Sequence, residues 1–183
     1  MKNNMKQIRR SLFETNSSST HAITIANNSE DDFKNNLPKT LELKLGEFGW
    51  EFDRYQTIRD RADYLFTAIV YNDKVEDYLQ KLVDTLKKWG VEVEYPKLKK
   101  VQSEYDKSYY YWVIESKPDE YFYIDHGGEL KDFLDDIFND ETLLMNYLFS
   151  PESFIATGND NSDEGLDTDT KATNILYDYY KGN

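Results

Sequence analysis

The chain of 183 residues contains two histidines, His21 and His126, and each stands in a polar segment beside a strand-like run. An imidazole titrates near neutral pH, so one ring can accept a proton while another donates one. Cleavage of RNA without a metal needs this combination, because a base removes the proton of the ribose 2′-hydroxyl and an acid protonates the departing 5′ oxygen. We therefore predict that His21 and His126 act as acid and base. The alternative, two structural histidines, stays open.

Groups that can hold a phosphate precede His21 in the sequence. A run of small polar residues, 15–20, follows two arginines and a carboxylate, and cationic, amide and hydroxyl donors stabilise the charge of a reacting phosphate. Beside the second histidine, Asp125 or Glu129 can orient the imidazole, although Asp125 points to the opposite face unless the strand has ended. The predicted phosphate- or RNA-binding residues are Arg9, Arg10, Asn16, Ser17, Ser18, Ser19, Thr20 and Asn161.

Three segments share one form, a strand end followed by a polar loop. They are residues 14–21, 125–129 and 157–164. Because each ends a plausible strand of one sheet, we expect the three segments to converge on one edge of that sheet.

Metal chemistry is the alternative for these segments. The chain has no cysteine, which excludes disulfides, thiolate zinc sites and cysteine nucleophiles. We predict no metal and no cofactor, with a hydrolytic magnesium site built from Glu14, Asp125 and Asp160 as the alternative. A calcium loop starting at Asp160 is incomplete, because Lys171 stands where the closing glutamate is required.

Hydrophobic periodicity places these segments on a predicted α+β fold. We expect a single domain, residues 1–183, with a mostly antiparallel sheet, an N-terminal β-hairpin at about 6–26 and helices packed on one face. Residues 96–108 are predicted to be a loop. The predicted helices are 58–70, 75–89, 130–138, 140–149 and 171–180, and the predicted strands are 6–13, 21–26, 41–45, 91–95, 109–115, 120–125 and 153–157.

The charge of the chain limits its partners. Lys and Arg number 22 and Asp and Glu number 35, so the net charge is −13 and the overall field does not attract nucleic acid. Three possibilities remain for its partners. The acidic charge serves solubility alone, the chain binds a basic protein, or it binds nucleic acid through a local basic patch such as the one that ends at Arg10. No segment has the length of a membrane span and the N-terminus lacks an apolar signal core, so we expect a cytoplasmic protein without membrane contact.

The run Arg10–His21 resembles the N-terminal signature of a protein family found in phages and mobile elements of Firmicutes. The resemblance extends to Ile124-Asp125-His126 and to residues 154–161, and it covers a minority of the chain. Some members of this family are type II-A anti-CRISPR proteins. They act on the guide RNA of the type II effector nuclease, either by blocking its loading or by causing it to be shortened.

The resemblance implies that the partners are a type II CRISPR effector nuclease and its guide RNA in a bacterial host cell, and that the N-terminal hairpin is needed for inhibition. Carried over by motif position, an RNA-processing site comprises Glu14, Ser17 to His21, Asp125, His126 and Asp160. One position departs from the motif, because a polar residue is expected after the second histidine and this chain has Gly127-Gly128. A non-enzymatic acidic inhibitor that blocks guide-RNA or DNA loading is therefore the alternative to RNA truncation. A third hypothesis is unrelated hydrolase or transferase chemistry on the same three loops.

Overall fold

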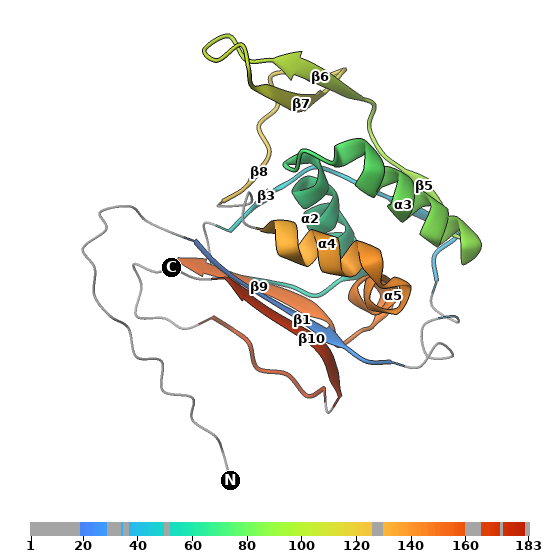
Figure 1. The fold of residues 1–183 in the computed structure, drawn as a ribbon. Coiled ribbons are helices and arrows are strands. Elements are labelled where there is room, and N and C mark those ends of the chain that lie inside the picture. The colour runs from blue at the N-terminus through green and yellow to red at the C-terminus, as the bar shows by residue number, and fades with distance from the viewer. Residues whose placement is uncertain are drawn as a thin grey trace.

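The computed structural model describes residues 19–28, 34, 37–49, 52–125, 130–159, 166–172 and 174–181. They form the predicted α+β fold, in which helices pack on one face of a mostly antiparallel sheet (Figure 1). A hairpin of β6 (Leu98–Gln102) and β7 (Tyr110–Ile114) stands on the far side of the helices from this sheet (Figure 1). In these ranges no helix combines the length and apolarity that crossing a membrane requires.

The main sheet has the strand order β10–β1–β9–β4, and all three pairings are antiparallel. The inner strand β1 is buried at every residue. Ile23 packs in the core under the helices, while Ala22 packs against Phe154 on the opposite face. The strands are β1 (Ser19–Ala26), β4 (Asp53–Tyr55), β9 (Phe154–Asn159) and β10 (Ile175–Lys181).

The partners of β1 differ from the predicted ones. The sequence predicts that residues 21–26 pair with residues 6–13, and residues 6–13 lie outside the described residues. In the structure one edge of β1 pairs with β9 and the other with β10, so two C-terminal strands hold it. Because both edges are occupied, β1 has no edge left for a hairpin with residues 6–13, and the structure corrects this pairing.

The helices at 58–70, 75–89, 130–138 and 140–149 are confirmed to within a residue or two. Thr57 and Asp60 form a reciprocal cap, in which the Asp60 N–H donates to Thr57 Oγ1 at 3.1 Å and the Thr57 N–H donates to Asp60 Oδ2 at 3.2 Å. The helices at 58–70 and 140–149 are buried on nearly every side. The bounds are α2 (Ile58–Val70), α3 (Val75–Lys88), α4 (Lys131–Asn139) and α5 (Glu141–Phe149).

A buried arginine ties α2 to the C-terminal end of α5. The Arg61 guanidinium donates to the carbonyls of Leu148 and Ser150, each at 2.8 Å, and also to those of Gln56 and Ser153. Burial lowers its pKa to about 10, yet the group stays charged near neutral pH. The last carbonyls of a helix carry partial negative charge, so this site suits a cation and fixes where β9 begins.

Two sequence predictions of local structure are wrong. Residues 171–180, predicted as a helix, contain β10, where Tyr177 and Tyr179 alternate with Asp178. The two tyrosine rings stack on each other, with centroids 6.4 Å apart, and pack against the core, while Asp178 accepts a hydrogen bond from Thr24 at 3.0 Å on the opposite face. Residues 96–108, predicted as a loop, contain β6.

Short parallel pairs complete the described fold. β2 (Thr40–Glu42) pairs with β5 (Glu92–Glu94), and β3 (Glu47–Phe48) pairs with β8 (Tyr123–Ile124). The β3–β8 pair places Asp125 beside the end of the main sheet, because the Asp125 N–H donates to the Phe48 carbonyl at 2.9 Å.

Candidate functional site

The ring of His21 connects three parts of the fold. Its Nε2 lies 2.9 Å from the backbone carbonyl oxygen of Asp125 and 3.0 Å from Ser19 Oγ. Its Nδ1 lies 2.9 Å from the hydroxyl of Tyr64 on α2. The Ser19 hydroxyl donates to the same Asp125 carbonyl at 2.9 Å. These contacts join β1, α2 and the end of β8 through one side chain, which is 0% exposed.

The contacts fit the tautomer of His21 that carries its proton on Nε2. A carbonyl oxygen only accepts hydrogen bonds, so Nε2 must be the donor to Asp125. The Nδ1 lone pair is then free to accept from Tyr64, which is also 0% exposed. Burial raises the pKa of Tyr64 well above its usual value, so the hydroxyl keeps the proton that it donates. A charged ring would have to be accommodated without solvent, which is costly.

Gly49 allows the chain to close over this ring. Its φ is +107°, a conformation that side chains other than glycine rarely adopt. A Cβ placed there would lie 2.7 Å from Cε1 and 2.9 Å from Nε2 of His21, and 3.2 Å from the Cβ of Asp125. Gly49 therefore meets two requirements at once, the backbone conformation after β3 and close approach to the imidazole.

The three polar segments converge at this end of the sheet, as the sequence predicts. In the antiparallel register of β1 and β9, Ser19 lies opposite Asn159 and His21 lies opposite Thr157. The hydrogen bonds to the Asp125 carbonyl bring in the third segment. The convergence is confirmed for the described residues of each segment.

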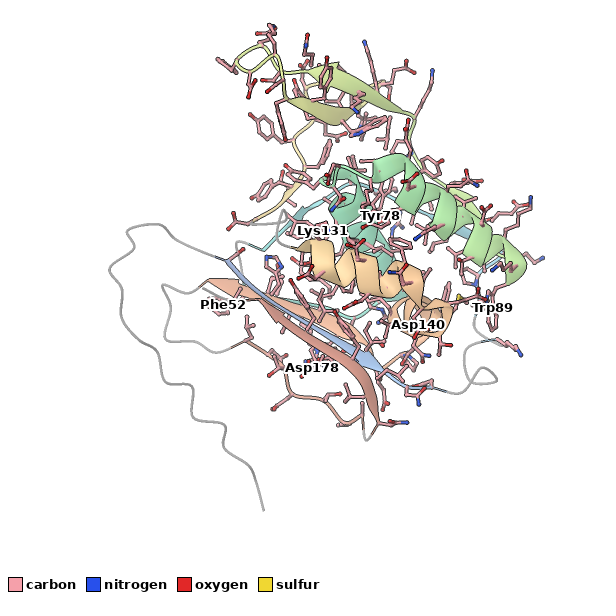
Figure 2. All side chains as sticks on the ribbon, in the orientation of Figure 1. Phe52, Tyr78, Trp89, Lys131, Asp140 and Asp178 are labelled. Atoms are coloured by element: carbon pink, nitrogen blue, oxygen red, sulfur yellow. The ribbon has the colours of Figure 1, made fainter. Side chains whose placement is uncertain are left out.

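Ser19 and Thr20 do not share one surface. Both are buried, at 2% and 7% exposure, and they alternate across the sheet, so only Ser19 reaches the His21 cluster. Thr20 pairs with Gly158, where an added Cβ would lie 2.7 Å from Phe52 Cε1 and 2.5 Å from Leu166 Cδ2. Phe52, labelled in Figure 2, thus covers the other face of the sheet at this end.

Asp125 contributes to the cluster through its backbone carbonyl, which accepts from His21. The prediction that Asp125 or Glu129 orients His126 involves residues 126–129, which lie outside the described residues, and stays a prediction. The carboxylate atom Oδ2 is buried and has no hydrogen-bond partner among the described residues.

The remaining predicted site residues lie outside the described residues, so their positions stay predictions. They are Arg9, Arg10, Glu14, Asn16, Ser17, Ser18, His126, Asp160 and Asn161. In the part of the chain that the structure describes, no group of three or more Asp, Glu or His side chains is arranged to hold a metal ion. Two carboxylates of the magnesium alternative, Glu14 and Asp160, fall outside that part.

Sequence reasoning missed Tyr64 and Gly49. The helix at 58–70 was predicted from apolar periodicity, which assigns no role to the Tyr64 hydroxyl, and in the structure this helix is buried nearly all round. For Gly49, the sequence pattern gives no sign of the close approach to His21. Comparison of the chain with protein-family models, with curated proteins and with solved structures found no match.

Proposed function

We propose that this chain inhibits a type II RNA-guided DNA nuclease, in the cytoplasm of a bacterial host, by causing cleavage of the guide RNA. The observation that supports the proposal is the convergence of the three polar segments, through the hydrogen bonds of Ser19 and His21 to the Asp125 carbonyl. These are also the segments on which the anti-CRISPR resemblance rests. Acid–base cleavage of a phosphodiester requires catalytic groups held in a fixed geometry, and strand ends gathered at one edge of a sheet can supply it.

Within this proposal His21 is a positioning residue. Its ring is 0% exposed and both nitrogens contact protein groups, so we assign it no direct contact with a phosphate in solvent. Its hydrogen bond fixes the Asp125 carbonyl, and the chain continues from that carbonyl into His126. We assign proton transfer to His126, paired with Glu14 or Asp160. One of these groups removes the proton of the 2′-hydroxyl, the 2′ oxygen attacks phosphorus, and the other protonates the departing 5′ oxygen.

The experiment incubates the protein with guide RNA, with and without the nuclease, and separates the RNA on a denaturing gel. We expect a discrete shortened product with the native chain and none with His126→Ala. Tyr105→Ala is the matched control, because Tyr105 is 101% exposed and far from the site in sequence, and it should leave the product unchanged. Guide RNA that stays intact in every lane would exclude the proposed cleavage.

A second candidate is favoured by the burial of His21. A buried histidine with both nitrogens hydrogen-bonded also fits a purely structural role. The −13 charge suits a protein that occupies a basic nucleic-acid channel. In that case the chain binds the nuclease and blocks loading without cutting RNA. Co-purification and inhibition that survive His126→Ala, with intact guide RNA, would select this candidate. Its affinity should then fall as salt rises.

A further inference from the structure

An aromatic pocket lies beside the β6–β7 hairpin, away from the His21 cluster. It has a volume of about 750 Å³ and is formed by β7, the residues after α2 and the residues before β8. Its aromatic lining residues include Tyr71, Tyr110, Tyr111, Trp112, Tyr121 and Phe122. We call this site the aromatic pocket. Figure 2 shows the side chains that project around the hairpin.

The rings of the aromatic pocket are unusually open to solvent. Tyr121 is 85% exposed, and Tyr110, Tyr111 and Tyr71 are each at least 40% exposed. Scattered exposed aromatic residues are ordinary, but a group gathered around one concave site marks an interaction surface. Tyrosine and tryptophan are also the residues that most often anchor partner proteins.

A cation already occupies part of this surface. The Nζ of Lys100 lies 5.6 Å from the ring centroid of Tyr110 and 5.8 Å from that of Trp112. Both distances are within the range in which a ring face attracts a cation. These two rings, which line the aromatic pocket, therefore accept positive charge on their faces.

The other charges at the aromatic pocket are negative. Asp73, Asp119 and Glu120 line it, and Lys100 is the one cationic residue among the lining residues that the structure describes. Glu120 pairs with Lys117 at 3.0 Å. Asp73 and Asp119 are exposed, and neither has a hydrogen bond or ion pair from its side chain in the described part of the chain. The whole chain carries −13, which adds to the attraction for a cationic ligand.

We propose that the aromatic pocket binds a basic segment of a partner protein, with arginine or lysine side chains on the aromatic faces and near Asp73 and Asp119. This goes beyond the proposed action on RNA and does not depend on it. An RNA strand fits less well, because its phosphates would lie beside unpaired carboxylates, although bases do stack on such rings. The guanidinium group suits the site best, since it is planar and stacks on aromatic faces.

The test titrates the full chain, labelled for amide NMR, with a short peptide that carries arginines separated by glycine and serine. The matched probes are the same peptide with citrulline in place of arginine, which is neutral and of similar shape, and an oligouridine RNA. We expect the arginine peptide to shift the resonances of residues 109–113 and 119–122, and the citrulline peptide to bind more weakly.

Two substitutions at exposed positions measure how much each contact contributes to binding of the arginine peptide, and neither removes a buried side chain. Asp119→Asn should weaken the arginine peptide by about two- to fivefold, the effect of one exposed ion pair. Tyr121→Ala should weaken it by about two- to fivefold, the effect of one exposed cation–π contact. Glu104→Gln, which removes a carboxylate of the same hairpin outside the pocket lining, should have no effect.

Lys100→Gln separates a peptide site from an RNA site by the sign of its effect. It removes the chain's own cation from the rings of Tyr110 and Trp112, so the arginine peptide should bind more tightly, by about two- to fivefold. If the pocket were an RNA platform, the same change would weaken oligouridine binding. The proposal is overturned by RNA shifts at these residues without peptide shifts, by equal affinity for the citrulline peptide, or by peptide shifts confined to other parts of the chain.

Discussion

Replacing Tyr64 by phenylalanine removes one hydroxyl and keeps the ring, so it isolates the hydrogen bond to His21 Nδ1. In the native chain this bond is 2.9 Å long and both residues are 0% exposed. No water can replace the lost donor without opening the core. The hydrogen bond between Tyr64 and Nδ1 would therefore be lost inside the core.

The expected cost follows from that burial. An unsatisfied buried acceptor costs about 1–3 kcal/mol. In a chain of 150–250 residues, 1 kcal/mol corresponds to about 2–4 °C in melting temperature, so Tyr64→Phe should lower it by roughly 2–12 °C. Tyr71→Phe is the matched control. The Tyr71 hydroxyl also donates to a carbonyl, that of Phe122 at 2.8 Å, but the residue is 45% exposed and water can take its place.

The assay is urea denaturation followed by circular dichroism, with both variants measured beside the native chain. We expect Tyr64→Phe to lose at least about 1 kcal/mol and Tyr71→Phe to lose less than about 0.5 kcal/mol. In addition, ¹⁵N NMR of the native chain should show His21 as the Nε2–H tautomer. Equal stability of the two variants, or a proton found on Nδ1 of His21, would refute the hydrogen-bond assignment.

Other substitutions test the supports of the site. Gly49→Ala should cost more stability than Gly90→Ala: both glycines have positive φ, at about 1–3 kcal/mol of strain, but only at Gly49 does the new Cβ also meet the histidine ring. Equal losses would contradict the close approach. Arg61→Met should cost at least about 3 kcal/mol by leaving several buried carbonyls unpaired, and a loss below about 1 kcal/mol in urea denaturation would contradict the network. NMR titration should find the pKa of Asp135 below its usual value, because it accepts hydrogen bonds, first from Lys131. Because the pKa of Asp135 is lower in the folded chain than in the unfolded chain, its hydrogen bonds stabilise the fold above about pH 4, and this stabilisation is lost as the pH falls through the folded pKa. An Asp135 pKa that is the same in the folded and unfolded chains would contradict this.

The parts of the fold that sequence predicts well are those set by local pattern. The helices at 58–70 and 140–149 follow from caps and apolar residues within the segments themselves. The convergence of three polar segments was predictable because each one directly follows or precedes a strand, and strand ends of one sheet meet at its edge. The described residues of the three segments do come together around His21.

What failed depends on contacts far apart in the chain. β1 pairs with β9 and β10, more than a hundred residues away, and no local signal distinguishes these partners from the nearby segment 6–13. β10 was predicted as a helix because its tyrosines become a strand pattern only when one face is covered by Phe133. Tyr64 reaches His21 because α2 is buried on nearly every side. Apolar periodicity in the sequence does not reveal this burial.

The chemistry of the RNA ends tests the central claim most directly. Guide RNA incubated with the native chain and the nuclease is analysed by mass spectrometry, with added chelator in a parallel sample. If protein groups remove the 2′-hydroxyl proton, the shortened RNA must end in a 2′,3′-cyclic phosphate, its partner fragment must begin with a 5′-hydroxyl, and chelator must have no effect. Full-length RNA, or fragments with 3′-hydroxyl and 5′-phosphate ends that disappear in chelator, would contradict the account.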